Sequence, residues 1–320
     1  MYSRILVPLD GSDVASQSLP YAALLAQAFN ARLDLLRAVP TLTALMTNAL
    51  TLEEHEGFDI RAVESPLTYQ QWDELHRQLR ETAEQDIEAA RASLGPGGVA
   101  PGTMVREGAP ADAIVDEALA QPDTLVVMTT HGRSGLRRWV LGSVTDRVVL
   151  SPAPVVVIRG QTEARAEVPV RFGRVILPLD GSKLAEQAVP AALALAENLG
   201  TPITVLRSLS LSDYGFGFGD YTLPHYSMGD FATGVRNDVK AYLDQTAEML
   251  RQRGAQEVTV SAPDGDPAET VLNEAENSPD SLIVMTTHGR SGIGRWVLGS
   301  VTDKVVRHSS SPVLVVRARV

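Results

Sequence analysis

The sequence predicts an α/β fold of two tandem doubly wound domains, each an open five-stranded parallel sheet with helices on both faces, related by a pseudo-twofold axis. Short apolar runs alternate with helical patterns, which is typical of parallel strands joined by helices. The same order of segments occurs twice in 320 residues, enough for two domains of ordinary size. Residues 128–149 also recur as residues 285–306, with 19 of 22 positions identical. We therefore expect two copies of one domain.

The first strand of each half ends in the same turn. An apolar run leads into the sequence Pro-Leu-Asp-Gly-Ser at residues 8–12, and its copy does so at residues 178–182. Ser12 and Ser182 are good N-caps for the helices that follow. A proline stands at the same place in each helix pattern and either kinks the helix or marks its true start.

Second strands are expected at residues 32–39 and 203–209. Each opens into a long connection, residues 40–70 in the first half and residues 210–233 in the second. Connections of this length are usually lids or binding loops, so we expect them to lie over the crevice mouths and to move more than the sheet. The first connection leads to a charged helix at residues 71–94.

Third strands at residues 102–107 and 257–262 lead through matched turns into helices at residues 114–119 and 271–275. Each helix is followed by a fourth, fully apolar strand that ends at the repeated loop.

The fifth strands, residues 155–158 and 313–316, are apolar edges that separate domains would leave open. We therefore expect the two strands to meet at the interface between the halves. The predicted units are residues 1–160 for the first domain, 161–172 for a polar linker and 173–320 for the second domain.

The repeated segment has the pattern of a buried strand, a glycine-bearing loop and a helix start. In the first copy Gly132 lies in the loop, and the helix begins near Gly142 and Ser143. Unpaired N–H groups at a helix start attract phosphate, and glycine allows a phosphate to approach the backbone. The alternative is that the glycines are turn and packing residues and Ser143 is an N-cap. Near-verbatim recurrence of a polar loop favours the phosphate site.

Composition argues against several classes of function. Asp and Glu outnumber Lys and Arg by 39 to 28, and the net charge of −11 argues against nucleic acid or an anionic membrane as the partner. The chain has no cysteine, which excludes disulfides, thiol catalysis and cysteine-zinc sites. No basic leader or membrane-length apolar run is present, so we expect a cytoplasmic protein. Neither a P-loop nor a kinase or hydrolase signature occurs.

Three motifs together resemble the universal stress protein family, here as a tandem of two domains. They are P-L-D-G-S after the first strand, G-x-P after the third, and T-H-G-x9-G-S-V after the fourth. The resemblance covers nearly the whole chain and implies the strand order 3-2-1-4-5. It also implies ATP held by a G-x2-G-x9-G-[ST] loop. On that order the first turn and the repeated loop face the same crevice, at the switch point between strands one and four.

The resemblance implies an adenine-nucleotide site in each half. Asp10 and Asp180 match the family's acidic residue near the adenosine, and Val39 and Leu209 match its backbone contact to adenine. In the first half the expected binding residues are Pro8, Leu9, Asp10, Val39, Met128, Thr129, His131, Gly132, Arg133, Gly142, Ser143 and Val144. In the second half they are Pro178, Leu179, Asp180, Leu209, Met285, Thr286, His288, Gly289, Arg290, Gly299, Ser300 and Val301.

One departure from the family motif concerns its first glycine, which is Thr129 in one half and Thr286 in the other. A β-branched residue is costly at this position if the backbone needs a positive φ. It is harmless if the family's glycine only makes room.

No catalytic residue is predicted. His131 and His288 are expected to fix the turn through ring hydrogen bonds, since no second His or Cys nearby completes a metal or nucleophile set. Asp10 and Asp180 are able to hold Mg²⁺ with a triphosphate, but a hydrogen bond to the nucleotide or to the turn backbone is the favoured role.

Three hypotheses for the function follow. The first is an ATP-binding regulatory or stress-response protein that holds the nucleotide, and the second is a slow ATPase that uses the same crevices. The third is an interaction module that has lost nucleotide, motivated by Thr129 and Thr286. The absence of an evident general base or nucleophile favours the first. The halves are expected to pair as a pseudo-dimer within the chain, and a homodimer stays open.

Overall fold

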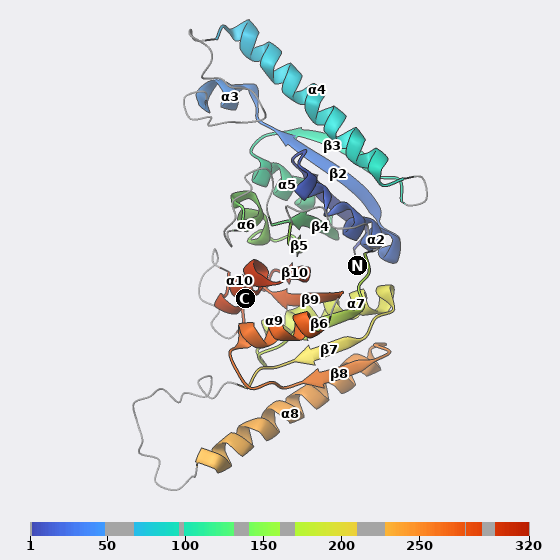
Figure 1. Ribbon diagram of the computed structural model, residues 1–320, viewed down its shortest axis with the longest axis vertical. Helices are drawn as coiled ribbons and strands as arrows, with labels where there is room; N and C mark the ends of the chain where they lie inside the picture. Colours follow the sequence, from blue (N-terminus) through green and yellow to red (C-terminus); the bar gives the residue numbers. More distant parts are fainter. Residues whose placement is uncertain are drawn as a thin grey trace.

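A computed structural model describes residues 2–48, 67–95, 99–130, 141–160, 170–209, 228–278, 280–289 and 298–319, without the side chains of residues 48 and 228–231. These residues form one continuous ten-stranded sheet with helices on both faces (Figure 1). The predicted linker, residues 161–172, lies largely outside the described part, and its last residue, Phe172, is buried against Tyr21.

The first half supplies five strands in the predicted order. Its elements are β1 (Arg4–Leu9), α1 (Asp13–Ser16), α2 (Leu19–Phe29), β2 (Arg32–Val39), α3 (Leu42–Asn48), α4 (Tyr69–Ser93), β3 (Gly102–Glu107), α5 (Pro110–Leu119), β4 (Thr124–Thr129), α6 (Ser143–Val149) and β5 (Val155–Ile158).

The second half repeats this plan, with a short 3₁₀ helix in place of α1. Its elements are β6 (Arg174–Pro178), η2 (Ala185–Ala188), α7 (Val189–Leu199), β7 (Ile203–Leu206), α8 (Met228–Gln252), β8 (Val258–Ser261), α9 (Pro267–Asn277), β9 (Ser281–Thr286), α10 (Ser300–His308) and β10 (Val313–Val316).

The strand order across the sheet is β3-β2-β1-β4-β5-β10-β9-β6-β7-β8, so each half has the order 3-2-1-4-5 in its own count. Strands within each half are parallel, whereas β5 and β10 pair antiparallel. Val156 pairs with Leu314, and the flanking pairs are Val155 with Val315 and Val157 with Val313. Equivalent residues therefore exchange places around a local twofold axis, and the predicted meeting of the fifth strands is confirmed.

Two apolar layers fill the space between the sheet and the helices. On one face α2, α4, α7 and α8 contribute residues such as Leu25, Ile87, Leu195 and Leu243. On the other face α5, α6, α9 and α10 contribute Ile114, Val148, Val271 and Val305. The central strands are buried on both sides, which explains their unbroken runs of apolar residues.

Several element boundaries differ from the sequence-based expectation. Pro20 and Pro190 stand in the first turns of α2 and α7, so they mark the starts of helices instead of kinking them. Likewise α5 and α9 begin at Pro110 and Pro267, four residues before the predicted helix starts. Proline fixes a helical φ and has no N–H to leave unpaired, which suits it to a first turn.

The two long connections contain more helix than expected. In the first, α3 packs on α4 through a small cluster of Leu45, Trp72, Leu75 and Leu79. In the second, α8 already begins at Met228. Residues 49–66 and 210–227 lie outside the described residues, so the predicted lid over each crevice stays a prediction. Within the described ranges, no helix has both the length and the apolar character needed to cross a membrane.

Candidate functional site

The turn after the first strand has the same construction in both halves. Asp10 Oδ1 accepts a hydrogen bond from the Ser12 backbone N–H at 3.0 Å, and Asp180 Oδ1 accepts one from the Ser182 N–H at 2.9 Å. Between them stands a glycine with a φ of +79° in the first half and +82° in the second. This left-handed conformation favours glycine. The turn thereby fixes each carboxylate at the carboxyl edge of the sheet, next to the fourth strand.

The serines of these turns start the following helices. Ser12 Oγ accepts from the Ala15 N–H at 3.1 Å and is the N-cap of α1. Ser182 Oγ makes the same 3.1 Å bond to the N–H of Ala185, the first residue of η2. The N-cap role is confirmed for Ser12, whereas in the second half the N-cap of η2 is Leu184 and Ser182 contributes the hydrogen bond alone.

Two threonines of each repeated segment connect the end of the fourth strand to the helix that follows the loop. The Thr145 hydroxyl donates to the Thr129 carbonyl at 3.0 Å, and the Thr302 hydroxyl donates to the Thr286 carbonyl at 2.8 Å. Thr129 and Thr286 are the last residues of β4 and β9 and are absent from the residues with positive φ. A β-branched side chain is therefore not strained there, and the departure from the family's glycine does not by itself close the site.

The next threonine in each copy holds the segment that follows the fifth strand. Thr130 Oγ1 accepts from the Gly160 N–H at 3.4 Å, and Thr287 Oγ1 accepts from the Ala318 N–H at 3.2 Å. Part of the near-verbatim repetition is thus explained by the fold alone, without any ligand.

The last motif glycine of each loop allows a close backbone approach. Gly142 and Gly299 are the N-caps of α6 and α10, with ordinary φ values of −60° and −59°. A Cβ built on Gly142 would lie 3.1 Å from the Thr130 carbonyl oxygen, and one on Gly299 would lie 3.0 Å from that of Thr287. A larger residue would therefore crowd the strand end. Ser143, which the alternative interpretation makes an N-cap, is instead the first helical residue, as is Ser300 in the second half.

The predicted adenine contacts at the ends of the second strands already hold backbone partners. The Val39 carbonyl accepts from the Gly108 N–H at 2.8 Å. Leu209 donates to the Pro263 carbonyl at 2.8 Å and accepts from the Gly265 N–H at 3.2 Å. Each of these carbonyl oxygens has a second lone pair, and an adenine base that donates to Val39 or Leu209 would have to use it.

Several other predicted residues have side chains that are buried in the core. Leu9, Leu179, Met128 and Met285 lie at or next to strand ends, so only their backbone groups could contact a ligand. Val144 and Val301 pack against the second apolar layer. Pro8 and Pro178 belong to β1 and β6, directly before these strand ends. Four predicted residues, His131, Gly132, Arg133 and Arg290, lie outside the described part of the chain.

In the second half the carboxylate and the repeated loop are in direct contact. A Cβ built on Gly289 would overlap Oδ2 of Asp180, so only glycine admits the carboxylate at this place. The sequence places these two residues more than a hundred positions apart, and the fold brings them together as the switch-point argument predicts.

His288 has one ring nitrogen in use and one without a partner. Its Nδ1 lies 3.1 Å from the Thr287 hydroxyl, in agreement with a role in fixing the turn. The Nε2 atom is buried and makes no hydrogen bond to the described part of the chain. A buried polar atom without a partner is unusual in a native structure and indicates that something else supplies the bond.

Sequence reasoning missed two arginines beside the first turns. Arg37 in β2 and Arg207 directly after β7 occupy matched places one strand away from Asp10 and Asp180. Their signal in the sequence is a cation near the end of each second strand, at the same distance after the aspartate turn in both halves.

A metal site is not preformed in the described ranges, where no group of three or more His, Asp or Glu side chains is placed to hold an ion.

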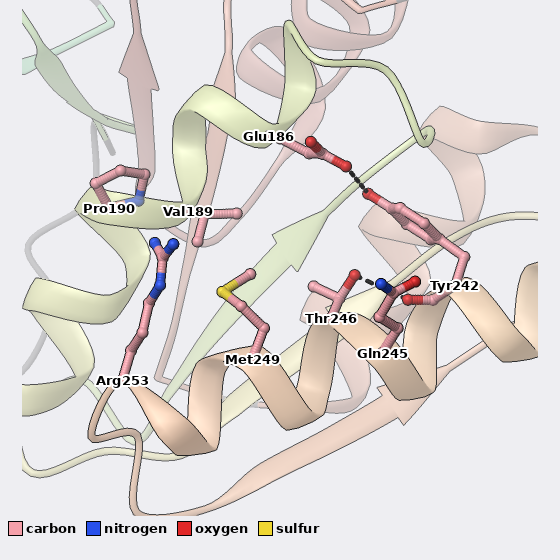
Figure 2. Close-up of a pocket in the computed structure, with 8 residues that line it drawn as sticks. All are labelled: Glu186, Val189, Pro190, Tyr242, Gln245, Thr246, Met249 and Arg253. Atoms are coloured by element: carbon pink, nitrogen blue, oxygen red, sulfur yellow. Dashed lines mark hydrogen bonds between the residues drawn. The ribbon is translucent and has the colours of Figure 1, made fainter.

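A groove of about 460 Å³ lies apart from the predicted crevices, between α8 and the segment formed by η2 and α7 (Figure 2). Figure 2 shows Met249 pointing toward Val189 in its middle and the Tyr242 hydroxyl meeting Glu186 at one end. None of the residues predicted from the sequence to bind nucleotide lines this groove.

Comparison with known proteins places both halves in one family. The model of the universal stress protein family matches residues 1–159 and 171–317. A universal stress protein of Bacillus subtilis is 30% identical over 149 residues, covering 46% of this chain and 99% of that protein. One from Methanocaldococcus jannaschii is 29% identical over 160 residues, covering 50% of this chain and 83% of that protein.

The fold comparison extends over the full chain. The crystal structure of a universal stress protein from Archaeoglobus fulgidus aligns with a TM-score of 0.65 at 20% identity and covers 99% of both chains. At that identity the likeness concerns the fold, namely two such domains in one polypeptide.

Proposed function

This chain belongs to the universal stress protein family, and from that premise we propose that it is an ATP-binding regulatory protein of the stress response. It holds one adenine nucleotide in the crevice of each half. The proposal takes residues 1–160 and 173–320 as the two binding units and places the protein in the cytoplasm.

The observation that carries the proposal is the buried, unpartnered Nε2 of His288 in the loop that follows β9. Its neighbour Gly289 touches the carboxylate of Asp180, so the ring lies beside the switch point of the sheet. Ligands of open α/β sheets bind at this point. A ligand that accepts or donates a hydrogen bond there would satisfy the ring nitrogen.

The carboxylates support an adenosine next to the first turn. Asp10 and Asp180 each use Oδ1 to hold the turn backbone, which fixes the direction of the other oxygen. A carboxylate held in this way suits the hydroxyl groups of a ribose, because a charged acceptor makes a stronger hydrogen bond than a neutral one.

The same geometry favours holding the nucleotide over hydrolysing it. The turn hydrogen bonds commit one oxygen of each aspartate to a structural role. In hydrolysis a general base must be free to take a proton from water within hydrogen-bond reach. We therefore assign Asp10 and Asp180 to binding.

Isothermal titration calorimetry with ATP tests the proposal in the full chain. We expect two sites in the wild-type protein. The Asp10→Asn and Asp180→Asn variants keep an oxygen that accepts the turn hydrogen bond but lose the charge. Each should weaken one site by roughly 10- to 100-fold, the effect of a lost charged hydrogen bond, and leave the other site intact. A matched control is Asp264→Asn, which removes an exposed carboxylate from the turn after β8.

A wild-type chain that takes up no ATP would refute the proposal. In that case the interaction-module hypothesis would replace it.

A further inference from the structure

Arg207 packs against the turn that carries Asp180. A Cβ built on Gly181 would lie 2.9 Å from Nη1 of Arg207 and 3.2 Å from its Cζ, so the guanidinium is in close contact with the glycine. The same glycine has a φ of +82°. The backbone conformation therefore favours glycine at this position, and the guanidinium fills the space that a side chain would take.

The guanidinium of Arg207 also lies over an aromatic ring. Arg207 Cζ lies 5.0 Å from the centre of the Tyr242 ring, within the range of a cation–π contact. The Tyr242 hydroxyl donates to Glu186 Oε1 at 3.1 Å (Figure 2). Burial, together with the charge of Glu186, raises the pKa of Tyr242, so the hydroxyl remains a donor at neutral pH. These contacts connect the turn to α8 and η2.

The matched arginine of the first half has a different partner. Arg37 is only 4% exposed, and its Nη2 lies 3.8 Å from Asp86 Oδ2 of α4. A carboxylate of α4 therefore attracts Arg37, whereas Arg207 lies over the ring of Tyr242.

We propose that Arg207 is a positioning residue of the second crevice, which braces the Asp180 turn against Tyr242 so that the carboxylate stays against Gly289. The inference rests on the proposed function, because it assigns Arg207 to the nucleotide site of that half. A planar guanidinium is suited to fill the space between a glycine backbone and an aromatic ring, and an ammonium group is not. The described contacts of the two matched arginines thus differ, with a carboxylate beside Arg37 and an aromatic ring beside Arg207.

ATP titration in the Asp10→Asn background, which reads mainly the second site, tests this proposal. We expect Arg207→Gln to weaken ATP binding about tenfold. Arg207→Lys keeps the positive charge but lacks the planar guanidinium group, so it should recover only part of the lost ATP affinity. Tyr242→Leu removes the ring and should reproduce most of the loss. The matched control is Arg253→Gln, which removes one positive charge from the far end of α8 and should bind as its parent does.

Hydrogen exchange of the Ser182 amide gives a second measurement that needs no nucleotide. This amide donates to Asp180 Oδ1 and so reports on the turn. The Ser182 amide should exchange faster in Arg207→Gln than in the wild type, and at the wild-type rate in Arg253→Gln. Unaltered ATP affinity and unaltered exchange in Arg207→Gln, with a wild-type chain that binds ATP, would overturn the role of Arg207 alone. Absence of ATP binding by the wild type would overturn the proposed function itself.

Discussion

Arg4 and Arg174 open the first strands of the two halves at matched positions, yet their surroundings differ. Arg4 is 1% exposed and donates to Asp34 at 2.6 Å and to Glu117 at 2.8 Å. Arg174 donates to the neutral hydroxyl of Thr204 at 2.9 Å. The same cation thus belongs to a buried ionic network in the first half and to a single hydrogen bond in the second.

This contrast predicts unequal effects of the same substitution. Arg4→Ala removes the charged hydrogen bonds to Asp34 and Glu117, although Arg32 still pairs with Asp34, and should lower the free energy of unfolding by roughly 1.5–3 kcal/mol. Arg174→Ala removes one bond to a hydroxyl and should cost about 1 kcal/mol. Urea unfolding of the two variants measures both values. Equal losses would mean that the Arg4 network is no stronger than its neutral counterpart.

Glu117 gives the network a pH dependence. Burial alone would raise the pKa of Glu117, but hydrogen bonds from Arg4 and Arg106 outweigh it and hold the pKa below its usual value. A lowered folded-state pKa adds stability above the unfolded pKa of about 4.3, and this stability is lost as the pH falls through the folded pKa. The difference in unfolding free energy between wild type and Glu117→Gln should therefore shrink as the pH drops below about 4. A difference that stays constant down to pH 3 would contradict this cause.

At the scale of elements, the starts of α6 and α10 are fixed by packing at least as much as by capping. Gly142 and Gly299 lie against the carbonyls of Thr130 and Thr287, and Thr145 and Thr302 donate to the ends of β4 and β9. These contacts hold the helix starts at the carboxyl edge of the sheet, where the crevices lie.

Gly299→Ala tests this packing. The added Cβ would lie 3.0 Å from the Thr287 oxygen and 3.5 Å from the His288 Cα, so strain should lower stability by about 1–3 kcal/mol. The matched control is Gly234→Ala, in an exposed part of α8 with nothing within 4 Å of the new Cβ. It should stabilise the chain by roughly 0.5–1 kcal/mol, because alanine favours helix more than glycine. Thermal unfolding of the two variants should shift in opposite directions, and a shared direction would argue against the packing role.

The sequence predicts elements whose determinants are local and misses contacts that depend on the whole fold. Apolar runs and turn glycines place the strands and the aspartate turns, and the repeat predicts which loop faces them. The meeting of Arg207 with Gly181 and Tyr242 has no local signal, because these residues come from three separate segments. The helix starts at Pro110 and Pro267 were also predicted too late, since hydrophobic periodicity does not register a proline in the first turn.

At the scale of the whole molecule, the two halves form one sheet. The pair of β5 and β10 buries Val156 and Leu314 at the local twofold axis. The interface is also crossed by an ion pair of 3.7 Å between Arg307 and Asp146 and by a 3.1 Å hydrogen bond from Arg317 to the Leu150 carbonyl. Because both cores continue through this sheet, the halves should unfold together.

Leu314→Ala tests this cooperativity. The cavity at the centre of the interface should cost roughly 2–5 kcal/mol, and calorimetry should still show one transition at a lower temperature. Val260→Ala, at the exposed edge of the sheet with 42% of its surface accessible, is the control with little expected effect. Two separate transitions in the wild type, only one of which responds to Leu314→Ala, would show that the halves are independent.

Native mass spectrometry of the purified chain titrated with ATP tests the central claim most directly, because it counts nucleotides on each folded molecule. The proposed function predicts a chain that carries up to two ATP and takes up GTP far less readily. The second site should fill least in Arg207→Gln. A spectrum with no nucleotide at ATP concentrations in the millimolar range, or with equal uptake of ATP and GTP, would contradict an adenine-nucleotide site in each half.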